Sequence, residues 1–299
     1  MNERLLVISP VRNEAKHFEQ VARAMAAQTR RPDMWLVVDD ASTDGTPALV
    51  ERLAKELPFL VLLHAPQTPT RAPVRDRLAA AAAPRTFNFG LRSVPWEGFT
   101  HISKLDGDME LPPDYFERLL QEFRRDPSLG IAGGIRRERV RGRTRLERVP
   151  SEHHVPGALK LYSLACFRAI GGMEERLGWD TIDETYARMR GFRTRTFSDL
   201  VAFHHRPWAS ADGTLRGRAR YGTAAYVVQF PLWWVALRSF KVAASPPEGL
   251  SGAAFLYGYL RAAAGRTSRV EDDSFRTFVR RELRARVLGR ARVKPIAAG

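Results

Sequence analysis

The first part of the chain alternates between short apolar runs and longer segments that carry one apolar stripe. Continuous apolar runs occupy residues 5–8, 34–38 and 59–63, which is typical of strands buried on both faces of a sheet. The segments between them place apolar side chains at helical spacing, for example Phe18, Val21 and Met25. Strands that alternate with helices predict an α/β fold with a mostly parallel central sheet flanked by helices.

A fourth apolar run, residues 101–105, ends in Asp106-Gly107-Asp108 and is followed by the proline-rich start of another helix. Parallel strands place their carboxyl ends at one edge of the sheet, and ligands bind there. We therefore expect the polar loops at 9–14 and 39–46 to lie near Asp108, an exposed carboxylate at its strand end. Two carboxylates separated by one small residue suit Mg²⁺ or Mn²⁺. The structural alternative is a polar turn that caps the next helix.

Composition narrows the class of protein. The 299 residues are 44% hydrophobic and 27% charged, so the chain can bury a core and is not disordered. Cys166 is the only cysteine, which excludes an internal disulfide and favours a reducing compartment. The sequence predicts neither a signal peptide nor a transmembrane helix. The net charge of +15 indicates an acidic partner, such as nucleic acid, anionic lipid or a phosphorylated substrate.

Basic residues gather in the segment 136–145, where they alternate with other side chains. This alternation predicts a solvated strand or the edge of a hairpin. The segment contains no aromatic residue to stack on bases, and the chain has no helix-turn-helix or zinc-ligand spacing. We therefore expect no nucleic-acid partner.

Four motifs lie at the predicted strand ends and in a helix between them. They are, in chain order, Ser9-Pro10-Val11-Arg12-Asn13-Glu14, Val37-Val38-Asp39-Asp40-Ala41-Ser42-Thr43-Asp44-Gly45-Thr46, Asn88-Phe89-Gly90-Leu91 and Leu105-Asp106-Gly107-Asp108. Their order and spacing together resemble a family-2 glycosyltransferase of the GT-A fold, over residues from about 4 to about 205. The resemblance implies a nucleotide-diphosphate sugar as donor, Mg²⁺ or Mn²⁺ as cofactor, and inversion at the anomeric carbon.

The resemblance also implies roles for particular residues. Asp40 corresponds to the aspartate that binds the nucleotide base, Asp108 to the one that binds the metal, and Asp106 to a ligand of the ribose or of a metal-bound water. Asp44 is expected mainly to form the turn. The residues expected to bind the donor are Pro10, Arg12, Asn13, Glu14, Asp39, Asp40, Arg85, Asn88, Asp106 and Gly107. Those expected at the metal are Asp108, Asp106 and His205. Arg75 is a further candidate for the diphosphate, and a charged helix face is the alternative for both Arg75 and Arg85.

A second acidic group lies in the segment 177–192, which resembles the family's acceptor-side motif and the catalytic base within it. Asp180 and Asp183 are three residues apart and share one face of the predicted helix. We expect Asp180 to be the base and Asp183 to be the alternative. Trp179 stands where many relatives have glutamate, and helix capping is the structural alternative for Asp180.

The last third of the chain differs in character. We expect residues 1–210 to form the catalytic domain, with a nucleotide-sugar part at about 1–110 and an acceptor part at about 111–210. Residues 211–299 are expected to form a helical, basic extension. Its two apolar segments, 221–238 and 250–260, contain Trp and Tyr and are flanked by arginines. This pattern is typical of helices that lie on an anionic membrane surface. The alternative is packing on the catalytic domain or on a second subunit of a homo-oligomer.

The sequence therefore predicts an inverting glycosyltransferase, cytoplasmic and peripheral on the cytoplasmic face of the membrane. The predicted acceptor is a glycan, a lipid-linked sugar or another molecule of cell-envelope or exopolysaccharide biosynthesis. One alternative is an inactive sugar-nucleotide-binding protein. Another is a nucleotidyltransferase, although residues 9–14 lack the glycine-rich, lysine-bearing loop of that class.

Overall fold

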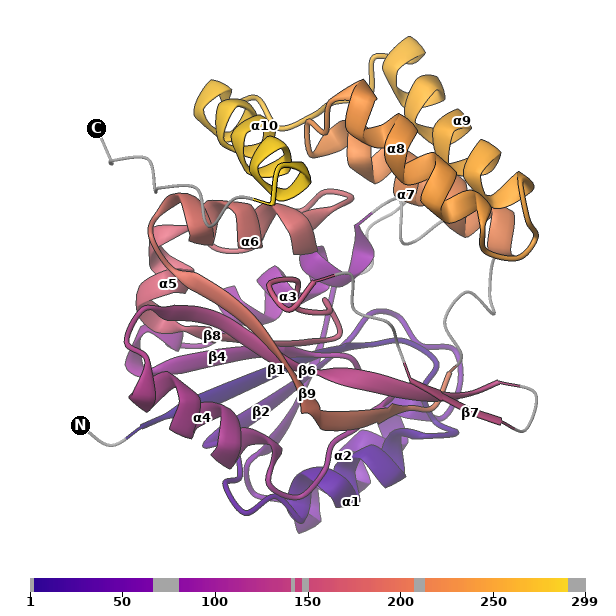
Figure 1. The fold of residues 1–299 in the computed structure, drawn as a ribbon. Coiled ribbons are helices and arrows are strands. Elements are labelled where there is room, and N and C mark those ends of the chain that lie inside the picture. The colour runs from indigo at the N-terminus through magenta and orange to yellow at the C-terminus, as the bar shows by residue number, and fades with distance from the viewer. Residues whose placement is uncertain (1–2, 67–80, 141–142, 147–150, 207–212, 290–299) are drawn as a thin grey trace. The chain divides into compact units, whose positions relative to one another are not determined.

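The computed structural model describes residues 3–66, 81–140, 143–146, 151–206 and 213–289 (Figure 1). It consists of two compact units, the first formed by Met1–Glu175 with Phe192–Pro207 and the second by Arg176–Gly191 with Trp208–Gly299. Residues 176–191 were expected in the acceptor part of the catalytic domain, whereas the structure groups them with the C-terminal helices. How the two units divide the function stays a prediction.

The first half of the sheet has the predicted alternation of strands and helices. Its parallel strands lie in the order β3-β2-β1-β4. Their bounds are Leu5–Val11 for β1, Met34–Asp39 for β2, Leu60–His64 for β3 and His101–Leu105 for β4. The helices between them are α1 (Phe18–Ala26), α2 (Thr46–Glu56) and α3 (Ala82–Arg92), with a short 3-10 helix at Trp96–Gly98. The α/β fold class is confirmed, because buried apolar strands and amphipathic helices alternate as expected.

The second half of the sheet is mixed in direction. Strand β8 (Leu159–Ser163) runs antiparallel to β4 and to β6 (Leu129–Val140), and β6 runs parallel to β9 (Arg193–His204). The short strand β5 (Met109–Glu110) pairs with β9, and β7 (Arg143–Leu146) forms a hairpin with β6. That hairpin is the predicted basic edge. Helices α4 (Tyr115–Arg125) and α5 (Leu164–Ala169) complete this unit.

The helices hold the strand ends in place by close packing on the sheet. The Phe18 ring of α1 stacks on Trp35 of β2, with ring centroids 5.4 Å apart. Helix α3 approaches the sheet through Gly90, where an added Cβ would lie 2.6 Å from Cγ2 of Val38. No side chain fits at that distance, so glycine at residue 90 lets the helix backbone rest on β1 and β2.

The second unit is helical, which confirms the predicted C-terminal extension. It contains α6 (Trp179–Met189), α7 (Thr214–Val227), α8 (Leu232–Ala243), α9 (Leu250–Ala264) and α10 (Asp273–Val287). Apolar side chains of α6 and α10 share one core, and those of α7, α8 and α9 share another. Among the described helices, none is both long and apolar enough to cross a bilayer.

Candidate active site

The carboxyl ends of β1, β2 and β4 meet at one edge of the first unit, as the sequence predicted. The backbone N–H of Asp40, just after β2, donates to the carbonyl of Val11 at the end of β1, at 2.9 Å. On the other side of β1, Gly107 lies against the same residue, because an added Cβ would be 2.5 Å from Cγ1 of Val11. Glycine between the two aspartates therefore allows the turn after β4 to close onto β1.

Asp108 lies at the centre of a charged cluster on this edge. Its Oδ2 is 3.2 Å from Nε2 of His204 and 2.9 Å from Nε of Arg206. Burial alone would raise the pKa of Asp108, but hydrogen bonds and charge from His204 and Arg206 hold it well below its usual range. The Asp108 side chain is only 6% exposed. The expectation of an exposed carboxylate was wrong, because strand β9 lies against β5 and covers it.

Glu14 joins the cluster from the loop after β1. The Arg206 guanidinium contacts the carboxylates of both Glu14 and Asp108, so one cation bridges two buried acids. Burial and the neighbouring charge of Asp108 raise the pKa of Glu14 to about 8, although Arg206 opposes the shift. Among the described residues, Oε2 of Glu14 has no hydrogen-bond partner.

The two histidines at the end of β9 have different partners. His204 contacts Asp108, whereas Nε2 of His205 lies 2.9 Å from Oε2 of Glu110 and its ring stacks on His17. His204 and Arg206 both contact Asp108, whereas His205 contacts Glu110 and His17 instead. The prediction placed the metal contact on His205, but the structure brings His204 to the aspartate.

Asp106 is held on the other side of the turn by a buried lysine. Lys104 is 2% exposed, and its ammonium contacts the Asp106 carboxylate. This ion pair gives Lys104 a structural role and fixes the first aspartate of the turn. Asp106 itself is partly exposed, so it still faces solvent at the strand edge.

The loops after β1 and β2 are tied together by residues that the sequence assigned to the donor. Arg12 donates from Nη1 to the Asp40 carbonyl at 3.0 Å, and Oδ1 of Asn13 accepts from the N–H of Thr43 at 2.8 Å. Asn13 has a positive φ of 55°, which asparagine tolerates better than most residues. Asp39 is buried and accepts from the N–H of Ser42 with both oxygens at 3.3 Å.

Asp44 has the turn-forming role expected of it. Its Oδ1 accepts from the N–H of Thr46 at 3.0 Å, and its Oδ2 accepts from the N–H of Ala15 at 3.2 Å. Slight burial would raise its pKa, but these hydrogen bonds lower it. Helix α2 begins at Thr46 after Gly45, so the Asp44 carboxylate binds the backbone N–H of the first residue of the helix.

The remaining predicted donor residues lie around this edge in different settings. Pro10 is half-buried within β1, beside Val38 of β2. Arg85 is exposed on α3. Asn88 donates to the Met173 carbonyl at 2.8 Å and to Oε1 of Glu175 at 3.1 Å, so its amide anchors the segment after α5. Arg75 lies outside the described residues.

The metal-ligand atoms around Asp108 fit a divalent cation that is also coordinated by phosphate oxygens of a substrate. Asp108 and His204 together offer one carboxylate and one imidazole on the same face of the sheet edge. In the described part of the chain, no three or more His, Cys, Asp or Glu side chains form a closed metal site. Mg²⁺ and Mn²⁺ are commonly held by one or two carboxylates together with substrate phosphates. Arg206 already places one positive charge between Asp108 and Glu14, which shows that this cluster accommodates a cation.

Comparison with known protein families identifies the class of protein to which this chain belongs. The family model described as Glycosyl transferase family 2 matches residues 6–169, more than half of the chain. The chain belongs to glycosyl transferase family 2. The resemblance that the four motifs indicated is therefore confirmed, and the protein is a glycosyltransferase with the expected GT-A-like fold.

Individual relatives of this transferase are distant. The Succinoglycan biosynthesis protein ExoA of Rhizobium meliloti (strain 1021) is 28% identical over 118 residues, which is 39% of this chain and 32% of that protein. The chain thus spans about a third of the length of the curated relative that it matches.

Solved structures support the same fold. Mannosyltransferase PcManGT from Pyrobaculum calidifontis, in complex with GDP-Man and Mn²⁺, has a TM-score of 0.56 at 20% identity and covers 94% of this chain and 84% of that chain. S. aureus TarS 1-349, in complex with UDP-GlcNAc, has a TM-score of 0.53 at 17% identity and covers 90% and 74%.

The transferase carries its second predicted acidic group on α6, in the second unit. Asp180 lies in the first turn of this helix and is partly exposed, whereas Asp183 is 2% exposed. Oδ1 of Asp183 accepts from the N–H of Glu184 at 2.6 Å. Their roles stay predictions, but exposure favours Asp180, because a base must reach a hydroxyl of the acceptor.

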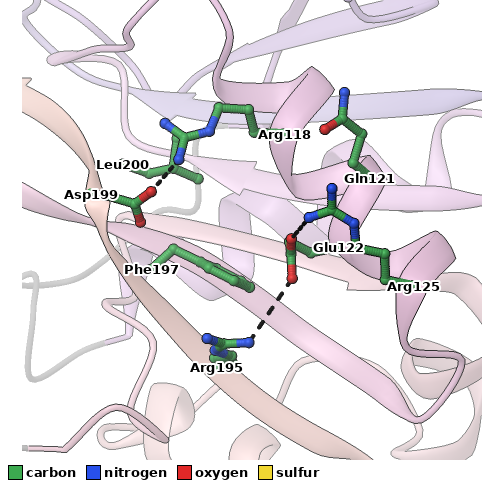
Figure 2. A pocket seen from close by; sticks show the side chains of 8 residues that line it. All are labelled: Arg118, Gln121, Glu122, Arg125, Arg195, Phe197, Asp199 and Leu200. Atoms are coloured by element: carbon green, nitrogen blue, oxygen red, sulfur yellow. Dashed lines mark hydrogen bonds and ion pairs between the residues drawn. The ribbon is translucent and has the colours of Figure 1, made fainter.

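The transferase also has a surface pocket of about 420 Å³ between α4 and β9 (Figure 2). Figure 2 shows the Phe197 ring between Asp199 and the side chains of Arg195 and Glu122. Each charged side chain that lines the pocket has an oppositely charged neighbour, such as Asp199 for Arg118 and Glu122 for Arg125. None of the predicted site residues lines it. The pocket is therefore separate from the predicted donor site.

Neither Arg206 nor His204 was among the site residues predicted from the sequence. Arg206 lies 98 residues from Asp108 and 192 from Glu14 along the chain, so no local pattern connects them. Strand β9 ends at His204, so strand alternation does not extend to Arg206 and could not have identified it.

Proposed function

We propose that this transferase moves a sugar from a nucleotide-diphosphate sugar to a hydroxyl of a glycan or lipid-linked acceptor, with inversion at the anomeric carbon. The observation that carries the proposal is the meeting of Arg12 with Asp40 and of Arg206 with Asp108 at one sheet edge. Two solved proteins of similar fold hold GDP-Man with Mn²⁺ and UDP-GlcNAc, which supports a nucleotide sugar as the donor.

On the donor side, Asp40 accepts a hydrogen bond from the base, and Arg12 and Asn13 lie beside it for the ribose or diphosphate. Mg²⁺ or Mn²⁺ would be held by Asp108 and His204, where it would neutralise charge on the departing diphosphate as a Lewis acid. Arg206 adds a permanent positive charge at the same place, and a guanidinium suits phosphate oxygens.

On the acceptor side, Asp180 takes the proton from the acceptor hydroxyl. The hydroxyl oxygen forms a bond to the anomeric carbon while the bond from that carbon to the diphosphate oxygen breaks. The nucleoside diphosphate leaves with the bonding electron pair. A single displacement of this kind inverts the anomeric carbon and needs no protein nucleophile. Asp183, one helical turn away, is the alternative base.

The acceptor belongs to the biosynthesis of a cell-envelope polysaccharide or exopolysaccharide. The likeness to ExoA, which its name assigns to succinoglycan biosynthesis, supports this class. The net charge of +15 and the basic, apolar C-terminal helices support a location on the cytoplasmic face of a membrane, where a lipid-linked acceptor is within reach.

The proposal is tested by the release of nucleoside diphosphate from a panel of UDP-sugars and GDP-sugars, with Mn²⁺ or with EDTA. We expect at least one donor to give Mn²⁺-dependent release, and Asp108→Asn to abolish it. Asp199→Asn is the matched control, because Asp199 is an exposed aspartate of the same unit that lies at the pocket of Figure 2. Release that persists equally in EDTA or in Asp108→Asn would contradict the metal-dependent mechanism.

A further inference from the structure

Exposed apolar side chains are concentrated in the second unit. Of the thirteen large hydrophobic residues exposed in the described part of the chain, eleven lie between Leu215 and Leu288. The other two are Val61 and Leu146. Exposed apolar side chains that gather on one surface mark an interaction site, whereas single exposed residues do not.

Helix α8 points its most apolar side outward. Trp233, Leu237 and Phe240 follow one another at spacings of four and three, so they share one helix face. They are exposed by 37%, 53% and 80%. The opposite face carries Val235 and Ser239, which are buried. The helix therefore uses a small buried stripe for packing and leaves its large side chains in contact with the surroundings.

Helix α9 has the same arrangement. Leu250, Tyr257 and Leu260 are exposed, while Phe255 and Gly258 face α7. The contact between α7 and α9 is close enough that a Cβ on Gly258 would overlap the Ala219 carbonyl. Backbone contact and the buried residues Val235 and Phe255 hold the helices together, so their outer faces are not needed for that purpose. We call Trp233, Leu237, Phe240 and the three exposed α9 residues the outer apolar face.

The charge beside this face is strongly positive. Between residues 214 and 264 the chain has six basic residues and a single acidic one, Glu248. The basic residues are Arg216, Arg218, Arg220, Arg238, Lys241 and Arg261. Two of them, Lys241 and Arg261, lie on α8 and α9 themselves and are exposed.

Two of the arginines are partly buried without a carboxylate. In the described part of the chain, neither Arg218 nor Arg238 forms an ion pair, and the Arg218 Nε has no hydrogen-bond partner. Burial lowers the pKa of Arg238; Tyr221 opposes this shift, whereas the positive charges of Arg218 and Arg286 add to it. A guanidinium in this setting is stabilised by an anion, and no ion-pair partner for either arginine is found among residues 176–191 and 213–289.

We infer that the outer apolar face docks on the surface of an anionic lipid bilayer, with α8 and α9 lying in its plane and the exposed Lys241 and Arg261 meeting lipid phosphates. Trp and Tyr favour the headgroup layer, and an apolar helix face beside basic residues is the pattern of interfacial helices. A spanning helix needs about 20 residues, whereas α8 has 12 and α9 has 15. The purpose of the docking rests on the proposed function, because a lipid-linked acceptor lies at the same surface.

A second copy of the chain fits this face less well than lipid does. In a two-fold dimer, the same patch meets itself. The basic residues beside the face of one copy would then lie against the identical basic residues of the other copy, which is repulsive. An anionic bilayer, in contrast, buries the apolar side chains and neutralises the basic residues beside them.

The test is flotation of the full chain with phosphatidylcholine vesicles, with and without phosphatidylglycerol. The key variant is Leu237→Glu with Phe240→Glu, since both side chains are exposed and their replacement leaves the core intact. Leu146→Glu is the matched control, because Leu146 on β7 is 54% exposed and Leu237 is 53% exposed. We expect wild type and control to float with phosphatidylglycerol vesicles, less so at high salt. The fraction of the double variant that binds these vesicles, expressed as a partition coefficient, should be lower than that of wild type by about tenfold or more.

A second variant, Lys241→Gln with Arg261→Gln, tests the charge and should reduce flotation and its salt dependence together. Flotation of the Leu237/Phe240 variant at the wild-type level would overturn the inference. So would a wild-type dimer that fails to float and that the same variant dissociates, because the occupant would then be a second copy. Release of nucleoside diphosphate with a soluble acceptor should be unchanged in these variants. Flotation without such release in wild type would sink the proposed function and leave the docking surface standing.

Discussion

At the scale of single residues, the two aspartates of α6 differ in what surrounds them. Asp180 is partly exposed, whereas Asp183 is buried and accepts a hydrogen bond from the backbone of Glu184. We therefore predict that Asp180→Asn lowers turnover by roughly 10²–10⁴ and leaves donor binding near normal, because only the positioned base is lost. Steady-state rates and nucleotide titrations measure the two effects. The reverse pattern, with turnover lost in Asp183→Asn and kept in Asp180→Asn, would show that the base lies one turn further along.

His101 gives a prediction on stability, because it lies at the start of β4, away from the charged cluster. Burial, with the positive charges of Arg124 and Arg30, lowers the pKa of His101 to about 4. The ring packs edge-on against Phe123 and stays neutral in the folded state. As the pH falls, His101 is protonated in the unfolded chain before it is protonated in the folded chain. The free energy of unfolding is therefore highest above the ordinary histidine pKa and decreases as the pH falls toward 4.

We expect the free energy of unfolding of wild type to fall by about 2 kcal/mol between pH 7.5 and pH 5 because of His101, whose pKa in the unfolded chain is about 6.5. His101→Gln removes this titration. Denaturant unfolding of both proteins at the two pH values measures the difference between them, which cancels the other titrating groups. An identical pH dependence for wild type and variant would count against a buried, neutral imidazole.

At the scale of elements, α3 depends on the absence of a side chain at residue 90. A Cβ there would lie 2.6 Å from Cγ2 of Val38, and that methyl group belongs to a packed core. Gly90→Ala should therefore lower the free energy of unfolding by about 1–3 kcal/mol. Gly217→Ala in α7 is the control, because nothing lies within 4 Å of its added Cβ. It should raise stability by about 0.5–1 kcal/mol. Equal effects of the two changes would contradict the close packing of α3.

Elements with strong local patterns were the ones that the sequence predicted well. The runs at 5–8 and 34–38 are buried strands, and Phe18, Val21 and Met25 form the buried face of α1, because periodicity reports burial directly. The turn at Asp44 followed from the same local chemistry. The burial of Asp108 could not be predicted in this way, because it depends on β9, whose pairing with β5 spans more than ninety residues.

At the scale of the whole molecule, function depends on residues that the chain brings together from far apart. Motif order was sufficient to indicate the family, and the family model confirms it over residues 6–169. Arg206 was identified only in the structure, where the segment after β9 brings it into contact with both Glu14 and Asp108. The long-range ion pairs at the sheet edge thus carry information that composition and periodicity do not contain.

The packing of the C-terminal helices also separates buried from exposed apolar residues. A sequence shows that 221–238 and 250–260 are apolar, but not which side chains are buried by their neighbours. The structure assigns Val235 and Phe255 to the packing of α7, α8 and α9, and it leaves Leu237, Phe240 and Tyr257 outside. The distinction turns a general expectation of membrane binding into a surface that can be mutated.

The central claim is that the strand edge at Asp108 binds a nucleoside diphosphate together with a divalent cation. Calorimetric titration of UDP and GDP into wild type and Asp108→Asn, each with and without Mn²⁺, tests it most directly. We predict that one nucleotide binds wild type in a Mn²⁺-dependent manner, and that Asp108→Asn loses the Mn²⁺-dependent part while unfolding cooperatively as wild type does. Mn²⁺-dependent binding of equal strength in Asp108→Asn, or no binding of either nucleotide to wild type, would contradict the account.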